Sequence, residues 1–293
     1  MTTIQVGHSQ GEHTSCLSYA GGLWVIARRE FRDAISSRWF LLYSLAFAGL
    51  AVAVSFLSLS GSGSQGFAGF GRTAAGLLNL IMLIVPLMAL SVGAGSIAGE
   101  RERGTLLYIM AQPLSRSQLL LGKYVGLACA LSCLLCLGFG ISALVLVWRA
   151  GGVGVGAYLV LVGATVLLAL AMLSISMVVS VMSRRVSVAT GVALFLWLAF
   201  VLLSDLGLMA GTLIFKLRVQ EVFALGVINP LQAFKLLVIF SINASLDVLG
   251  PVGSYASRVY GEWLGWLIGG VMAMWAVVPV TLAVILFAKR ITV

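Results

Sequence analysis

Charged residues are scarce in this sequence. Its 293 residues include 18 Lys and Arg and 9 Asp and Glu, together 9%, whereas 61% are hydrophobic. A globular domain has about a quarter of its residues charged, and most of these cover its surface. This chain has too few charges to cover a surface in water. The composition therefore excludes a soluble domain and predicts an integral membrane protein.

Motifs for nucleotide, peptide or ester hydrolysis are also missing. The sequence has no Walker lysine loop, no HExxH and no Gly-x-Ser-x-Gly. The glycine-containing runs at 99–104 and 151–156 are not phosphate loops, because neither lies between a predicted strand and a predicted helix. We therefore expect a non-catalytic protein without a cofactor. Any energy that it uses must come from a separate subunit.

Cysteines number only four, and three of them lie close together at Cys129, Cys133 and Cys136. The CxxxCxxC spacing matches the loop that holds an iron–sulfur cluster in radical enzymes. Here the three cysteines share one face of an uncharged helix, among Leu, Ala and Ser. Free cysteine in such a place is a small packing residue. We predict packing and no metal, and the less favoured alternative is a soft-metal contact such as Cu(I).

The sequence also lacks the alternation of apolar and polar residues that marks a membrane β-barrel, so its long apolar runs are predicted to be helices. About 20 apolar residues cross the core of a bilayer, and six runs are long enough. The predicted fold is an all-α integral membrane protein, with one membrane domain at 39–293. Its predicted spans are about 39–59, 73–98, 119–147, 157–182, 186–215 and 263–288.

The net charge of +9 is explained by the membrane rather than by nucleic acid. Basic residues collect on cytoplasmic loops. With the N-terminus inside, twelve of the 18 basic residues lie on the cytoplasmic side and six lie outside. We therefore expect a multi-pass protein of the inner membrane, with both termini in the cytoplasm and no nucleic-acid partner.

The N-terminal region divides into a tail and a helix. Residues 1–22 are polar and have no apolar signal-peptide core, so we predict a disordered tail. Residues 23–38 are too charged to span, but their apolar side chains follow helical spacing at Trp24, Ala27, Phe31, Ala34 and Ile35. We predict an amphipathic helix in the cytoplasmic interface, with its arginines at the lipid headgroups. The alternative is a basic flank that only sets orientation.

Two features lie toward the outer side. Asp205 is the one acid within an apolar span, and an intramembrane carboxylate is a functional candidate, although this one is close to the outer end of its run. Residues 216–262 form the longest predicted segment outside the membrane, and loops of that length usually have a function. Within it, residues 231–246 are apolar but short, so we expect them in the outer interface or against another subunit.

The stretch from Gly99 to Lys123 is the densest cluster of charge between two apolar runs. Glu100 and Glu102 are predicted to lie at the entrance of a short helix, whose N-terminus favours negative charge. Pro113 would stop that helix, and Ser115 could cap the next one. Arg116 and Lys123 are predicted to lie near the headgroups. On these residues alone, a lever that touches a soluble partner and a charged turn that only fixes topology are equally supported.

This stretch resembles the loop between the second and third spans of ABC-2-type transporter permeases. The family pattern is Glu-x-Glu-x-Gly-Thr-Leu, then Pro-Leu-Ser-Arg, then Leu-Gly-Lys. The matching residues here are Glu100, Glu102, Gly104, Thr105, Leu106, Pro113, Leu114, Ser115, Arg116, Leu121, Gly122 and Lys123. The resemblance implies a type V exporter-like fold with an elbow helix before the first span. It also implies a permease homodimer that carries separate ATP-binding subunits, with this loop, Arg101 included, as the ATPase-coupling helix.

Within that family, the chain resembles the permeases of nitrous-oxide reductase maturation. The resemblance rests on Arg38-Trp39, the run at 99–107, the run at 118–123 and Asn229-Pro230. It departs from the pattern at Ser117, where a glycine is expected. This subgroup implies copper-site assembly, with 216–262 docking a periplasmic partner.

Other functions stay open at this point. One is a drug, lipid or polysaccharide exporter, and another is a mechanical transmitter that drives a periplasmic partner without passing substrate. An ion channel or a proton-coupled carrier would need more intramembrane charge than Asp205 alone supplies.

Overall fold

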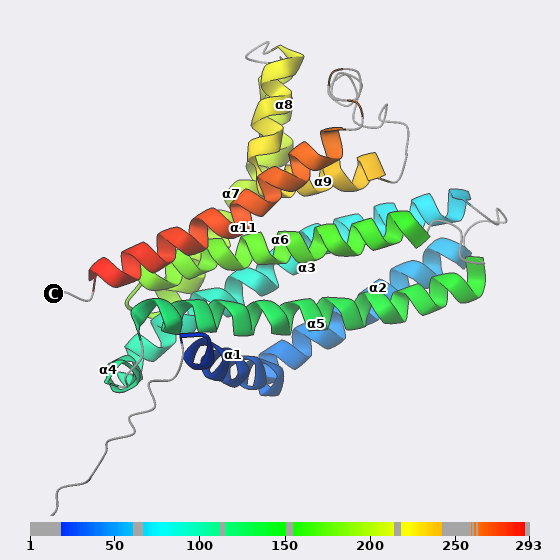
Figure 1. The fold of residues 1–293 in the computed structure, drawn as a ribbon. Coiled ribbons are helices and arrows are strands. Elements are labelled where there is room, and N and C mark those ends of the chain that lie inside the picture. The colour runs from blue at the N-terminus through cyan, green and yellow to red at the C-terminus, as the bar shows by residue number, and fades with distance from the viewer. Residues whose placement is uncertain are drawn as a thin grey trace, which may run out of the picture.

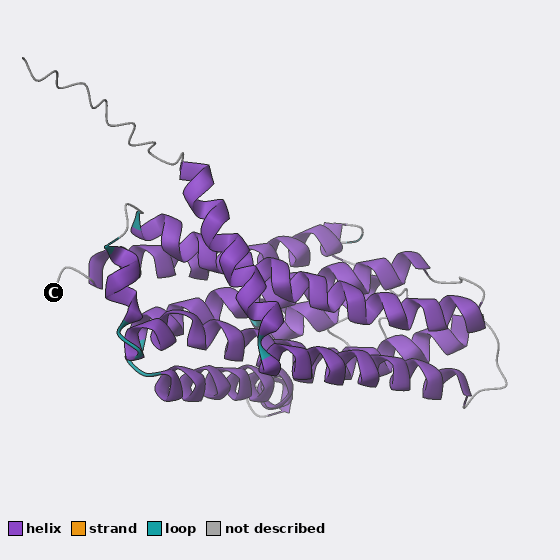
Figure 2. Cartoon of the chain, turned by 90° about the horizontal axis from the view of Figure 1, so that it is seen from below, coloured by secondary structure: helices purple, strands orange, loops and turns teal. Residues whose placement is uncertain are grey.

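The computed structural model describes residues 19–60, 67–111, 115–150, 155–213, 218–241, Val259, Gly261 and 263–290. This described part is built of helices and contains no strand (Figure 2). The helices are α1 (Tyr19–Ser36), α2 (Arg38–Ser60), α3 (Phe67–Glu102), α4 (Thr105–Met110), α5 (Arg116–Ala150), α6 (Val155–Met182), α7 (Val186–Leu213), α8 (Val219–Ile228), α9 (Pro230–Ser241) and α11 (Trp263–Arg290).

The long helices lie side by side in one bundle, with α6 in its middle (Figure 1). α6 contacts α3, α5, α7, α9 and α11, and 61% of its apolar segment is buried within the chain. The C-terminal end of α11, α1 and α4 lie toward one end of the bundle, whereas α8 projects from its side (Figure 1). The all-helical membrane fold expected from the sequence is confirmed.

Five of the described helices, α3, α5, α6, α7 and α11, are long and apolar enough to cross a bilayer. Two bent pairs raise the number to as many as seven if each pair counts as one span. They are α1 with α2, bent by 65°, and α8 with α9, bent by 108°. The predicted count of exactly six spans therefore stays a prediction.

Small residues hold α3 against α6. A Cβ placed on Gly93 would lie 1.8 Å from Oγ of Ser176, so only glycine fits at this contact. One turn further, Oγ of Ser180 accepts hydrogen bonds from the backbone N–H groups of Ile97 and Ala98, both at 3.0 Å. Close approach through small residues is how helices associate in membranes, where apolar burial alone provides little attraction.

Specific hydrogen bonds hold the break between α8 and α9 in place. The Asn229 side chain donates to the carbonyl of Phe200 on α7 at 2.8 Å, and its oxygen accepts from the N–H of Leu231 at 3.0 Å. Trp275 of α11 donates to the carbonyl of Ile228 at 2.9 Å. α9 then packs against α6 and α11 with seven of its residues buried. The sequence predicted residues 231–246 at an interface, whereas six of the described residues 231–241 are buried in the chain's own core.

Candidate functional site

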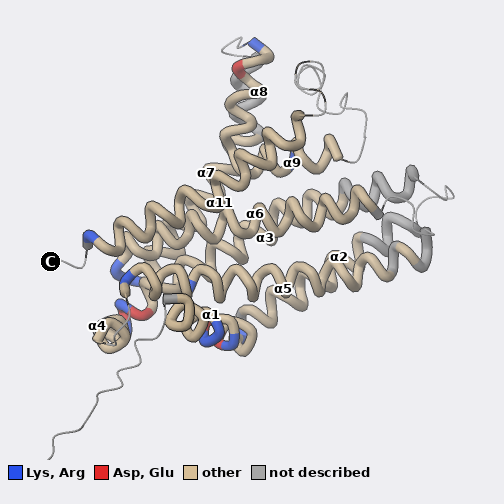
Figure 3. Tube along the Cα trace, in the orientation of Figure 1, with Lys and Arg blue, Asp and Glu red and all other residues tan. Residues whose placement is uncertain are grey.

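Most of the charged residues gather at one end of the bundle, around α1, α4 and the end of α11, and a few lie on α8 (Figure 3). The stretch from Gly99 to Lys123 lies in this region and contributes the end of α3, all of α4 and the start of α5. Its side chains bind to several other helices. These contacts decide which residues of the stretch hold the fold and which are available to another protein.

The two acids of the stretch lie in the last turn of α3, so their predicted position at the start of a short helix is wrong. A helix C-terminus disfavours negative charge, and specific partners offset this. Glu102 Oε2 accepts from the N–H of Val186 at 2.8 Å and so caps the start of α7. Arg101 donates to the carbonyls of Val181 at 3.0 Å and Ser183 at 2.7 Å at the end of α6. Neighbouring side chains therefore clamp the end of α3 onto the α6–α7 turn.

A tight turn leads from α3 to α4. Gly104 has φ of +73°, the left-handed conformation that glycine adopts without strain. Thr105 Oγ1 donates to the carbonyl of Glu100 at 3.3 Å, which holds the start of α4 against α3. Leu106 is buried, whereas Tyr108 is 76% exposed. α4 is thus a short helix fixed along one side, with an aromatic residue facing outward.

Ser115 caps α5, as the sequence predicts. Its Oγ accepts from the N–H of Gln118 at 3.2 Å, and Gln118 Oε1 accepts from the N–H of Ser115 at 2.7 Å, which forms a reciprocal capping box. Arg116 donates to the carbonyl of Ala288 at 2.8 Å and so binds the end of α11. Its predicted place near the headgroups stays a prediction. Pro113 and Leu114 lie outside the described residues.

Gly122 lets α1 approach α5. A Cβ on Gly122 would lie 2.8 Å from Ile26, and one on Gly126 would lie 2.5 Å from the carbonyl oxygen of Ala27. The two glycines are four residues apart, so they share one face of α5. The glycine in the Leu-Gly-Lys motif is therefore explained by packing of the N-terminal helix.

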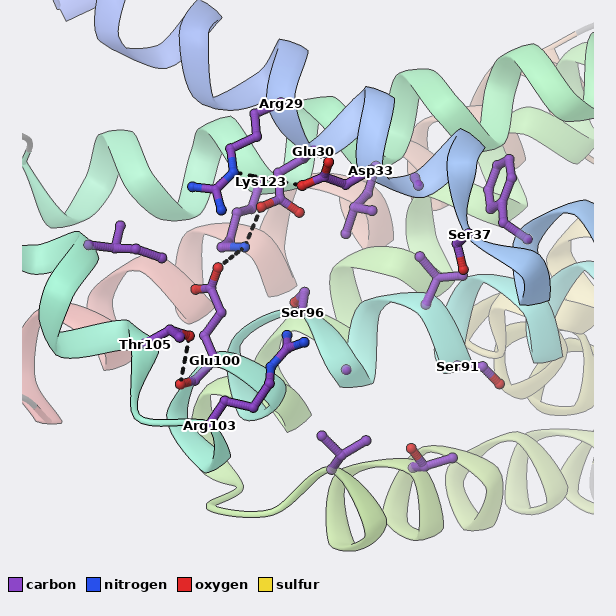
Figure 4. A pocket seen from close by; sticks show the side chains of 18 of the residues that line it. Arg29, Glu30, Asp33, Ser37, Ser91, Ser96, Glu100, Arg103, Thr105 and Lys123 are labelled. Atoms are coloured by element: carbon purple, nitrogen blue, oxygen red, sulfur yellow. Dashed lines mark hydrogen bonds and ion pairs between the residues drawn. The ribbon is translucent and has the colours of Figure 1, made fainter.

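Lys123 lies in the core, so its predicted place at the headgroups is wrong. It is 2% exposed and is held between two carboxylates (Figure 4). Its Nζ is 2.5 Å from Oε1 of Glu30 on α1 and 2.8 Å from Oε1 of Glu100 on α3. One buried cation thus joins α1, α3 and α5. The sequence analysis missed Glu30, although it is the one glutamate among the arginines of α1.

α1 itself begins at Tyr19, four residues before its predicted start, and residues 1–18 lie outside the described part. Ile26, Ala27 and Ala34 are buried, whereas the predicted apolar-face residues Trp24 and Ile35 are exposed. The helix packs on α5 rather than only lying on a membrane. Its arginines at 28, 29 and 32 are all exposed.

The three cysteines do share one face of α5, but that face is exposed, so the prediction that they pack in the core is wrong. Leu137 and Ile141 continue the same exposed face. The described residues contain no group of three His, Cys, Asp or Glu that could hold a metal ion. Asp205 lies within α7, and its side chain is outside the described part.

Comparison with known proteins identifies the family. The sequence model of the ABC-2 family transporter proteins matches residues 24–290. The chain is 33% identical over 276 residues to a probable ABC transporter permease protein NosY of Stutzerimonas stutzeri, covering 92% of this chain and 99% of that protein. It is 34% identical over 276 residues to a protein of the same description from Pseudomonas aeruginosa, covering 92% and 98%. The chain belongs to the ABC-2 family of transporter proteins.

Proposed function

We propose that this permease subunit converts nucleotide-driven movement of a separate ATP-binding subunit into movement of its own spans, with α4 as the contact. The observation that carries this proposal is the attachment of α4. Its outer residue Tyr108 is exposed, while the turn before it is clamped through Arg101 and Glu102 to the α6–α7 turn. A push on α4 therefore reaches α3, α6 and α7 through short, directed contacts rather than through a loose loop.

A homodimer is supported by α7. Only 11% of its apolar segment is buried within the chain, compared with 50% for α5, 56% for α3 and 61% for α6. Phe195 and Leu203 are among its exposed side chains. We propose that a second copy of this chain covers part of this surface and that lipid covers the rest. Two copies would present two α4 helices, one for each ATP-binding subunit.

The direction of the chain in the membrane follows from its charges. The end that carries α4 also carries the basic residues of α1, the α6–α7 turn and α11, and basic residues remain in the cytoplasm. We propose that this end is cytoplasmic, where ATP is available, and that both termini lie there. The side of α8 then faces the periplasm, where we propose that the predicted outer segment 216–262 docks a periplasmic partner.

We further propose that the complex serves copper-site assembly of a periplasmic nitrous-oxide reductase, on the basis of similarity to the two NosY proteins. The buried hydroxyls favour mechanical transmission over passage of a polar substrate. Ser174 donates to the carbonyl of Ala276, Ser176 donates to that of Leu173, and Ser180 accepts from α3. These hydroxyls form hydrogen bonds with backbone groups of their own helix or of a neighbouring helix within the chain. A drug, lipid or polysaccharide exporter is the alternative, and it requires a substrate path between the two copies.

The test is deletion of this chain in the organism that encodes it, followed by purification of its periplasmic nitrous-oxide reductase and measurement of bound copper. We expect copper loading to fall without the chain and to return with the wild-type chain. As a control, the deletion strain also receives the Trp266→Ala variant, which alters an 81% exposed side chain far from α4 and should restore copper loading as the wild-type chain does. Full copper loading in the deletion strain would reject the maturation role and favour an exporter.

A further inference from the structure

A cavity of about 870 Å³ lies beside the Lys123 ion pairs. It is lined by α1, the start of α2, α3, α4, α5 and the start of α7, including Glu100, Arg103 and Val92 (Figure 4). Cavities of roughly 300–1,000 Å³ are typical of sites for small organic molecules. The cavity adjoins the proposed contact, since Tyr108 of α4 also lines it, but coupling does not explain the charged groups in its wall.

One wall of the cavity has an unused acceptor. Glu100 is 8% exposed, and while its Oε1 binds Lys123, its Oε2 is buried without a hydrogen-bond partner among the described residues. A buried carboxylate oxygen without a partner is costly. It can be satisfied by an N–H or O–H donor that enters the cavity. No described group donates to Oε2, so a ligand that enters the cavity can supply this donor.

The same wall has an unused donor. Arg103 uses Nε to bind the carbonyl of Gly99 at 3.1 Å, and its two terminal nitrogens have no partner in the part of the chain that the structure describes. Its guanidinium reaches toward Ser96 at the cavity in Figure 4. A guanidinium binds phosphate oxygens by paired hydrogen bonds. The wall therefore offers an acceptor for an ammonium and, three residues away, a donor for a phosphate.

Away from Glu100 the lining of the cavity is mixed, with Ser37 and Ser91 beside apolar side chains. Val92 lies about 12 Å along α3 from Glu100, at 1.5 Å per residue, and Phe40 and Leu127 also line the cavity. Leu41, Leu42 and Leu45 follow Phe40 on α2 and are exposed. A phospholipid has the same order of groups, from a charged headgroup to apolar chains. The cavity also lies at the charged ends of the spans, which is the level of lipid headgroups.

We propose that this cavity binds the headgroup of a phospholipid with a primary amine, with the ammonium on Glu100 Oε2 and the phosphate on Arg103. The primary amine is required because a quaternary ammonium has no N–H to donate. A zwitterionic headgroup is favoured over a purely anionic one, since an ammonium both donates to the buried carboxylate oxygen and compensates its negative charge, whereas a hydroxyl only donates. The bound lipid would thereby contact α1, α3 and α7 at the end where the coupling segment is attached.

The test is native mass spectrometry of the full chain in detergent with phosphatidylethanolamine, phosphatidylcholine or phosphatidylglycerol of identical acyl chains. Because a hydrogen bond to a charged group is worth about one power of ten in affinity, we expect phosphatidylethanolamine to bind roughly tenfold more tightly than either other lipid. Arg103→Gln should weaken the binding of all three lipids, since each has a phosphate, whereas Arg28→Gln, which makes the same charge change outside the cavity, should leave binding unchanged.

Glu100→Gln should remove the preference for phosphatidylethanolamine, and Arg103→Gln keeps the phosphate contact testable if loss of the Lys123 ion pair unfolds the Glu100 variant. Equal binding of the three lipids, a preference that survives Glu100→Gln, or unchanged lipid binding by Arg103→Gln would overturn the proposal. A third arm uses free glycerophosphoethanolamine, which has the same headgroup without acyl chains. Binding of this molecule as tight as that of the lipid would assign the site to a soluble zwitterion and overturn the lipid assignment.

Discussion

Lys123→Met is expected to lower the free energy of unfolding by about 3–5 kcal/mol, because removal of one partner leaves the others as uncompensated buried charges. Lys123 is 2% exposed and is the only described cation within 4.0 Å of the carboxylates of Glu30 and Glu100. The loss of packing is small, since methionine replaces most of the aliphatic chain. Thermal unfolding of the purified chain in detergent measures the change.

The control combines Lys123→Met with Glu30→Gln and Glu100→Gln. This triple variant removes all three charges together, and a buried ionic cluster replaced by neutral groups of similar size is often close to neutral in stability. We expect it to recover most of the loss of Lys123→Met. A triple variant as unstable as the single one would show that the aliphatic packing of Lys123, rather than its charge, holds α1, α3 and α5 together.

Gly126→Ala is the second large effect, with an expected loss of about 1–3 kcal/mol from overpacking. The new Cβ would lie 2.5 Å from the carbonyl oxygen of Ala27, and backbone atoms cannot move aside as a flexible side chain can. α1 must then shift away from α5. Thermal unfolding reports the loss of stability, and faster trypsin cleavage after Arg28, an exposed residue of α1, reports the release of the helix.

Gly140→Ala on the same helix is the matched control. A Cβ there meets nothing within 4 Å, so the substitution should stabilise the helix by about 1 kcal/mol through alanine's higher helix propensity. Opposite signs at the two glycines are the expected result. A loss of the same size at both would mean that glycine is needed for flexibility of α5, and the packing explanation of Gly122 and Gly126 would fail.

The sequence predicted the helices well because apolar length and missing charge are local signals. α6 spans Val155–Met182, compared with the predicted 157–182, and α11 spans Trp263–Arg290, compared with 263–288. The cap of α5 by Ser115 was also predictable, since a cap and its partner Gln118 are three residues apart. Such features depend on neighbours in the chain.

The partners of the site residues could not be predicted in the same way. Lys123 is 93 residues from Glu30, and Glu102 is 84 residues from Val186, so nothing local marks either pair. The cysteines show the same limit. Their common face on α5 followed from spacing, but whether that face is covered by another helix depends on how the helices are arranged.

The most direct test of the coupling account is a photo-crosslinking residue in place of Tyr108, with irradiation of membranes from the native organism. The account predicts a crosslink to a protein with a Walker nucleotide-binding loop, which mass spectrometry identifies. The same residue in place of Trp266, which is 81% exposed on α11, should give no such crosslink. Absence of an ATP-binding protein at position 108, with its capture at position 266, would contradict the assignment of α4 as the coupling helix.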